Sequence, residues 1–101
     1  MKSILVSVYD KKAQFFDKPV VAVNIETAIR MIQNTFQDAN CQGLQIVKTP
    51  ADFQLFQIGT FDDNNGNIET SLQLITELAA LQQSDLFNQE QDNNGKVTSS
   101  Q

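Results

Sequence analysis

The stretch FQLFQIGTFDDNNGNI, residues 53–68, decides the fold of this 101-residue chain. Residues 53–61 alternate as a β-strand does, with Phe56 and Ile58 on one face. The other face carries Phe53, Leu55, Gly59 and Phe61. Residues 62–67 are Asp, Asn and Gly, and the Asn65-Gly66 pair suits the positive φ of a tight turn. Strand, turn and the apolar Ile68 that follows predict a hairpin, and therefore an antiparallel sheet.

Two further strands and a helix are predicted on the N-terminal side of this hairpin. Residues 3–9 place Ile4, Val6 and Val8 on one face and Leu5 and Tyr9 on the other. Residues 18–23 form a second strand that has a proline near its start, where a missing N–H is tolerated. Residues 25–37 form a helix with its apolar side chains at helical spacing, and Asn24 can cap it. The members of this apolar face are Ile25, Ala28, Ile29, Ile32 and Phe36.

The remaining segments predict shorter elements and a tail. We expect a short strand at 44–47 and a single helical turn begun by Thr49 and Pro50. A second helix is predicted at 70–83, and its broad apolar stripe either forms a dimer contact or folds back over the sheet. The fold class is α+β, a small mainly antiparallel sheet packed by one helix, with a C-terminal helix. One domain spans residues 1–87, and the polar, acidic residues 88–101 are expected to be disordered.

The composition excludes most catalytic and metal chemistry. The chain has no histidine, and Cys41 is its single cysteine, so neither an imidazole base, nor a Cys/His zinc cluster, nor an internal disulfide is available. Aligning Gly66 with the glycine of an EF-hand loop puts Phe61 and Leu72 at the first and last ligand positions, which excludes a calcium loop. We expect no enzymatic activity, no cofactor and no metal ion.

The N-terminal apolar run is too short for a signal peptide, and nothing approaches the roughly 20 apolar residues of a membrane span. The sequence therefore predicts a soluble, intracellular protein.

Charge is unevenly distributed along the chain. The net charge is −5, which by itself argues against affinity for a polyanion. Residues 1–48 carry six basic groups against four acidic ones, a net of +2, whereas residues 49–101 carry one lysine against eight acids, a net of −7. This division indicates either a basic face with an acidic tail or chance in a small chain.

One segment, residues 9–18, combines aromatic rings with positive charge. Rings can stack on bases and ammonium groups can meet phosphates, as proteins that bind single-stranded nucleic acid without sequence preference require. The alternative is that Phe15 and Phe16 are core residues beside a lysine-rich turn. With one basic residue of the predicted helix added, the candidate nucleic-acid-binding residues are Tyr9, Lys11, Lys12, Phe15, Phe16, Lys18 and Arg30.

Several blocks in a fixed order resemble a known family. The blocks are SVYDKKA at 7–13 with Phe16 and Pro19, Asn24 with AIR at 28–30, PADF at 50–53 with Leu55, and IGTFDD at 58–63 with Gly66. Over residues 3–69 the chain is similar to the small nonstructural protein of the gokushoviruses, icosahedral microviruses with single-stranded DNA genomes. The resemblance implies a non-capsid protein of the infected cell that acts in viral DNA replication, single-strand synthesis or packaging. It supplies no catalytic residues, and the residues after Thr70 extend beyond the shorter versions of the family.

Two functional hypotheses result. The first is a phage-encoded, dimeric protein of the host cytoplasm that binds single-stranded DNA and assists viral DNA replication. The second is a protein-interaction module, an adaptor or inhibitor of a host or viral replication protein, without DNA contact. The negative net charge favours the second, and the segment 9–18 favours the first. An internal particle component is a third option, but the chain lacks the strongly basic composition of DNA-condensing proteins.

Overall fold

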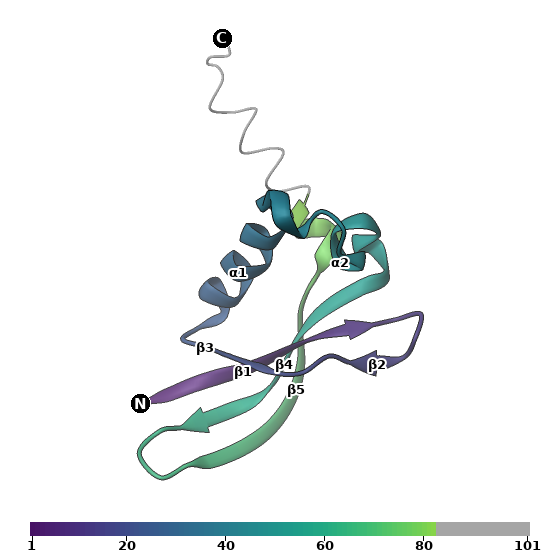
Figure 1. The fold of residues 1–101 in the computed structure, drawn as a ribbon. Helices are drawn as coiled ribbons and strands as arrows, with labels where there is room; N and C mark the ends of the chain where they lie inside the picture. Colours follow the sequence, from purple (N-terminus) through teal and green to yellow (C-terminus); the bar gives the residue numbers. More distant parts are fainter. Residues whose placement is uncertain (83–101) are drawn as a thin grey trace.

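The computed structural model describes residues 1–82, in which five strands form one antiparallel sheet (Figure 1). The strand order is β2-β1-β4-β5, and β3 pairs with β1 as well. The strands are β1 (Lys2–Asp10), β2 (Phe15–Phe16), β3 (Val20–Ala22), β4 (Phe53–Asp62) and β5 (Asn67–Glu77). β1 and β4 pair along their whole lengths, from Lys2 opposite Asp62 to Asp10 opposite Phe53. The predicted α+β class, its antiparallel sheet and the 53–68 hairpin are confirmed.

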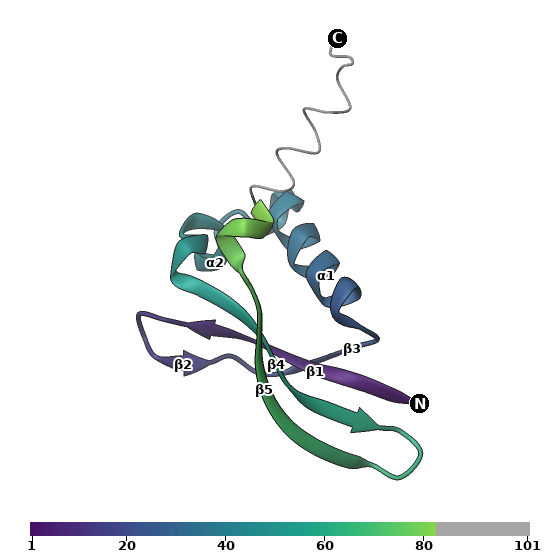
Figure 2. The same cartoon turned by 180° about the vertical axis from the view of Figure 1, so that it is seen from behind.

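Helices gather on one side of this sheet (Figures 1 and 2). The longest is α1 (Ile25–Gln37), and the side chain of Asn24 caps it by accepting the backbone N–H of Thr27 at 2.8 Å, as predicted. Shorter turns follow at η1 (Ala39–Cys41), α2 (Gln45–Lys48) and η2 (Pro50–Asp52), and residues 78–82 are helical after β5. No helix within the described residues is long and apolar enough to cross a membrane.

The core lies between α1 and the sheet. Leu55 of β4 and Leu78 are fully buried, and Val6 of β1 is nearly so. Ala28 of α1 is also buried, and its small side chain lets the helix approach the strands closely. Each fully buried leucine contributes about 1.5–3 kcal/mol through removal of its surface from water. The sheet face toward α1 therefore carries the hydrophobic core. We call the opposite face of the sheet the outer face.

The predicted helix at 70–83 is wrong over most of its length. Residues 67–77 form strand β5, which pairs with β4 from Asn67 opposite Asp62 to Glu77 opposite Gln54. The leucine spacing fits a helix, but Ile68, Thr70, Leu72 and Leu74 also repeat every second residue. The adjacent β4 provides a hydrogen-bonding partner, and tertiary pairing overrides the helical pattern. Within the part of this segment that the structure describes, only residues 78–82 are helical.

The predicted strand at 44–47 is also wrong, because Gln45–Lys48 form the short helix α2. Short apolar runs fit a buried helical turn as well as a strand, and here only Val47 is buried. The helical turn at Pro50 is confirmed as η2, although the side chain of Thr49 makes no capping hydrogen bond. The predicted strand 18–23 is shortened to β3. Residues 83–87 of the predicted domain and the predicted tail 88–101 lie outside the described residues.

Gly59 allows close contact between β4 and β5. The pairing of the two strands shifts register between Gln57 and Gly59. A Cβ atom placed on Gly59 would collide with the backbone carbonyl oxygen of Glu69. The bulged crossing of the two strands therefore requires glycine at this position.

Candidate nucleic-acid interface

The register of β1 and β2 separates the two adjacent phenylalanines. Phe16 pairs with Tyr9, and Phe15 pairs with Asp10. Paired residues share a face and neighbours alternate, so Phe15 and Phe16 point to opposite sides of the sheet. Val8 packs against the core beneath α1, which puts Tyr9 and Phe16 on the outer face.

Three rings meet on the outer face, and we call Tyr9, Phe16 and Phe56 the aromatic cluster. The ring centroids of Tyr9 and Phe16 lie 4.7 Å apart with the planes tilted by 46°. Phe56 meets Phe16 edge to face at 5.5 Å and Tyr9 at 6.0 Å. Tyr9 and Phe56 are half-buried, whereas Phe16 is 41% exposed. Mutual packing fixes the rings while leaving ring surface open to a flat ligand.

Phe56 is the member of the cluster that sequence reasoning missed. It lies in β4 opposite Ser7 of β1, next to the fully buried Leu55. The signal was present, because the alternation of residues 53–61 puts Phe56 on the face opposite Leu55. What the sequence did not show is that β1 and β2 bring two more rings to the same place.

A tight turn holds two lysines at the end of the β1–β2 hairpin. One carboxylate oxygen of Asp10 accepts the backbone N–H groups of Lys12 and Ala13, both at 3.0 Å. The N–H of Gln14 donates to the carbonyl of Asp10 at 2.7 Å, and Gln14 adopts a φ of 62°. The side chains of Lys11 and Lys12 are thus presented from an ordered turn adjoining the aromatic cluster.

Both lysines have acidic partners. The Nζ of Lys11 lies 3.0 Å from Oε1 of Glu77, and the Nζ of Lys12 lies 3.6 Å from Oδ2 of Asp52. The amide of Gln54 donates to Glu77 at 2.7 Å, and this hydrogen bond together with that from Lys11 lowers the pKa of the Glu77 carboxyl. Exposed pairs of this kind are weak, about 0–1 kcal/mol, so a phosphate can compete for the lysines.

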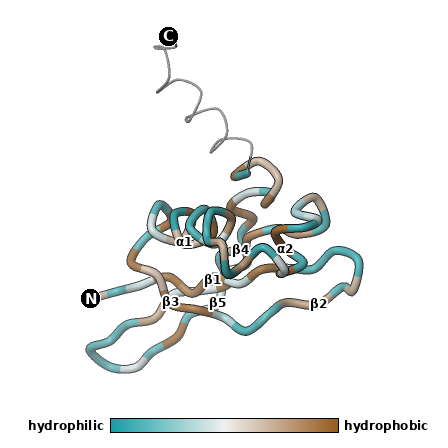
Figure 3. The backbone as a smooth tube through the Cα atoms, turned by 45° about the horizontal axis from the view of Figure 1, so that its top comes forward, coloured by the Kyte–Doolittle hydropathy of each residue, from teal (hydrophilic) through white to brown (hydrophobic). Residues whose placement is uncertain are grey.

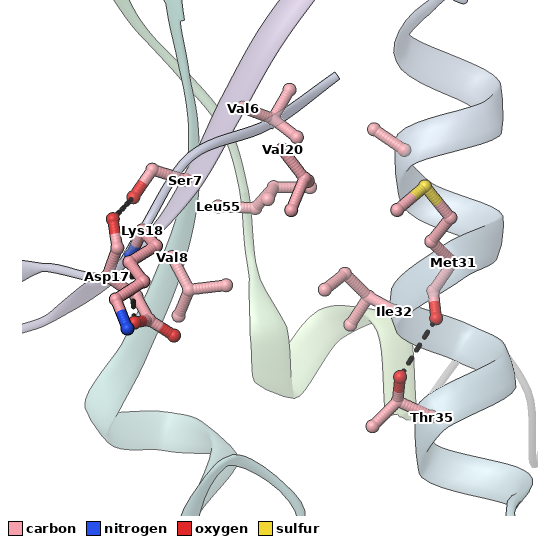
Figure 4. A pocket seen from close by; sticks show the side chains of 11 residues that line it. Val6, Ser7, Val8, Asp17, Lys18, Val20, Met31, Ile32, Thr35 and Leu55 are labelled. Atoms are coloured by element: carbon pink, nitrogen blue, oxygen red, sulfur yellow. Dashed lines mark hydrogen bonds between the residues drawn. The ribbon is translucent and has the colours of Figure 1, made fainter. Parts of the chain in front are cut away.

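Lys18 and Arg30 lie away from the aromatic cluster. Lys18 borders an apolar pocket of about 180 Å³ between β1 and α1 (Figure 4). Beside it the hydroxyl of Ser7 donates to the carbonyl of Asp17 at 2.6 Å, and the Asp17 carboxylate accepts the Lys18 backbone N–H. Arg30 is exposed on α1. The structure therefore joins Tyr9, Phe16, Lys11 and Lys12 at one hairpin, while Phe15, Lys18 and Arg30 do not reach the outer face.

Comparison with known proteins identifies a family. A family model described as phage ORF5 protein matches residues 3–81, a span that includes the aromatic cluster and both hairpins. No curated protein and no solved structure matches the chain.

Proposed function

The chain belongs to the phage ORF5 protein family, and we propose that it is a nonstructural, single-stranded DNA-binding protein. It would act in the host cytoplasm, without enzymatic activity, in viral DNA replication, single-strand synthesis or packaging. Its proposed source is a phage with a single-stranded DNA genome, of the gokushovirus kind.

The observation that carries this proposal is the partly exposed aromatic cluster beside a turn with two lysines. Tyr9 and Phe16 hold their rings against each other, so stacking a base on them costs little additional side-chain entropy. Stacking is worth about 1–3 kcal/mol per base and is insensitive to base identity. A duplex hides its base faces, and this geometry therefore favours single strands.

Lys11 and Lys12 supply the electrostatic part of the proposal. Each lysine would exchange a carboxylate partner for a DNA phosphate. Each therefore contributes less to the free energy of DNA binding than an unpaired lysine would. The expected affinity is modest and strongly dependent on salt, because each phosphate contact releases counterions.

The same ion pairs favour a second candidate function. If Glu77 and Asp52 keep the two lysines neutralised, the exposed rings form a hydrophobic contact for a protein. The chain would then be an adaptor or inhibitor of a host or viral replication protein. Such a complex would be insensitive to salt, unlike a complex with DNA.

Fluorescence anisotropy of a labelled single-stranded oligonucleotide tests the first function. The titration is run at about 20 and 150 mM salt, and with double-stranded competitor. We expect saturable binding that weakens as salt increases and that the double-stranded competitor does not displace. Absence of binding at low salt would contradict DNA binding and favour the protein partner.

Two matched substitutions locate the binding surface. Phe16→Leu keeps an apolar side chain on the outer face but removes the flat ring, and we expect a loss of affinity of about fivefold or more. Phe15→Leu makes the same change on the opposite face, where the phenyl ring is 55% exposed. Equal losses of DNA affinity in the two variants would show that the outer face is not the DNA-binding surface. Circular dichroism of both variants checks that they remain folded.

A further inference from the structure

Apolar side chains lie across four strands of the outer face, from the β4–β5 turn to the middle of the sheet, and those of β5 and β3 are exposed. In β5, Ile68 is 58% exposed, Leu72 63% and Leu74 51%. Phe61 pairs with Ile68, and Val21 of β3, 54% exposed, pairs with Leu5 of β1. We call these residues the apolar patch, and its members are Leu5, Val21, Phe61, Ile68, Leu72 and Leu74.

The polarity of β5 is the reverse of what a single domain requires. In an antiparallel sheet with one covered face, apolar residues normally point toward the helices and polar residues toward water. Phe61, paired with Ile68, is neighboured by Thr60, which shares the face of Ile4 toward the core. Ile68 and Phe61 therefore point outward, away from α1. Apolar side chains of β5 thus alternate onto the outer face, a pattern typical of a strand that is covered on that face.

The β4–β5 hairpin extends beyond the helices, and all of residues 67–74 are exposed (Figures 1 and 3). β5 is the last strand of the sheet, and it contains neither lysine nor proline, the residues that commonly protect an edge strand. An exposed apolar strand without such protection indicates a contact with another protein surface.

The size of the apolar patch suits a second copy of this chain. In β5 the apolar patch runs from Ile68 to Leu74, about 24 Å at about 3.4 Å per residue, and four strands are about 19 Å wide, which gives on the order of 450 Å². Stable interfaces bury about 800 Å² per partner, and weaker ones less. An interface of this size indicates a dimer that dissociates on dilution.

Charge opposes self-association least at this surface. Two copies with a net charge of −5 each repel one another over most of their surfaces. No member of the apolar patch is charged, and in β5 the carboxylate of Glu69 lies between the outward-facing Ile68 and Thr70, on the other face. Across a two-fold axis the same patch meets itself, and an uncharged patch meets no like charge there.

We propose that the chain forms a symmetric homodimer in which the apolar patches of two copies pack face to face. The contact runs from the Lys2–Asp62 end of the sheet to Leu74, which lies opposite Phe56 of the aromatic cluster, and the lysine-bearing β1–β2 turn is at the Asp10–Phe53 end. Dimerisation thus leaves this turn outside the interface.

Sedimentation velocity of the full chain without DNA, from about 1 to 500 µM, tests the dimer. The wild type is expected to shift from monomer to dimer with concentration, and the dimer to persist in high salt. Leu72→Glu puts a charge at the centre of the contact and should raise the dimer dissociation constant at least about a hundredfold. Ser71→Glu is the matched control, since it adds the same charge to the next residue of β5 on the opposite face.

Val21→Glu provides a second disruption from the other side of the apolar patch, in case Leu72→Glu fails to fold. A wild type that stays monomeric at 500 µM would overturn the proposal and leave the patch for a different protein. A dimer unaffected by both patch variants, or equally weakened by Ser71→Glu, would also overturn it. Because no DNA is present, these results are independent of the anisotropy experiment.

Discussion

The two hairpins of the sheet share a turn architecture and differ in the side chains that they present. In the β1–β2 turn the N–H of Gln14 donates to the carbonyl of Asp10, and in the β4–β5 turn the N–H of Gly66 donates to the carbonyl of Asp62. The residue that closes each turn has positive φ, 62° and 76°. In each turn the aspartate side chain also accepts a backbone N–H two residues later. Backbone geometry therefore does not distinguish the hairpins.

Their chemistry does distinguish them. The β1–β2 turn carries Lys11 and Lys12 next to the aromatic cluster, whereas the β4–β5 turn carries Asp62 and Asp63 next to Phe61 and Ile68 of the apolar patch. The turns lie at opposite ends of the paired β1 and β4. One face of the sheet thus carries rings and lysines at one end and uncharged apolar side chains at the other, and we propose a polyanion for the first end and a second copy for the other.

The largest effect is expected from Gly59→Ala, which breaks the second hairpin. The added methyl group collides with the backbone carbonyl of Glu69, so β4 and β5 must move apart. We expect a loss of about 1–3 kcal/mol in the free energy of unfolding, measured by urea denaturation. Gly43→Ala is the control, because nothing lies within 4 Å of its added Cβ. Similar losses of unfolding free energy in both variants would contradict the close contact between β4 and β5 at Gly59.

Removing the positive charge of the first hairpin tests whether this hairpin binds a polyanion. The double substitution Lys11→Gln and Lys12→Gln should weaken single-stranded DNA binding about tenfold at 0.1 M salt. The slope of log affinity against log salt should fall by about 1.4 if each lysine meets one phosphate. Asp62→Asn with Asp63→Asn changes as many charges in the other hairpin, and we expect no loss of affinity. An unchanged slope in the lysine variant would place the phosphate contacts elsewhere.

Releasing Lys11 from its partner should have a smaller effect in the opposite direction. Glu77→Gln keeps a polar side chain beside Gln54 but removes the carboxylate that holds the Lys11 ammonium group. We expect a twofold to fivefold gain in DNA affinity, with a salt slope that is the same or steeper. Affinity that stays the same, measured by anisotropy, would show that Lys11 does not contact DNA.

The smallest effect is the pH dependence contributed by Glu77. Hydrogen bonds from Gln54 and Lys11 lower the pKa of its carboxyl in the folded chain below the ordinary value of about 4.3. Its contribution to stability is therefore complete above that value and is lost as the pH falls through the lowered folded pKa. The side chain is 43% exposed, so the loss should stay below about 1 kcal/mol. Urea denaturation from pH 6 to pH 3 should show a shallower decline for Glu77→Gln than for the wild type.

Local signals predicted a large part of the fold. Residues 25–37 were predicted as a helix because five apolar residues follow a 3.6-residue period and Asn24 precedes them, and α1 has the same limits. The 53–68 hairpin followed from strand alternation and the Asn-Gly turn. These signals act within a few residues and need no knowledge of distant parts of the chain.

The candidate site was predicted only in part, since its assembly is non-local. Tyr9 and Phe16 were named from the sequence, but Phe56 joins them only through the pairing of β1 with β4, across more than 40 residues. That pairing, together with the pairing of β4 with β5, brings Glu77 to 3.0 Å from Lys11, 66 residues away. Charge counted along the chain suggested a basic segment, and the folded chain places carboxylates beside it.

The sequence by itself determined the α+β class, the main helix, the central hairpin and the segment that combines rings with lysines. Only the tertiary structure decided that residues 67–77 are a strand. Their apolar spacing fits both a helical and a two-residue period, and hydrogen bonding to β4 selects the strand. The tertiary structure also decided which face each ring occupies and which lysines have acidic partners. The physical reason is that periodicity is a local property, whereas register, burial and ion pairing depend on segments that meet only when the sheet forms.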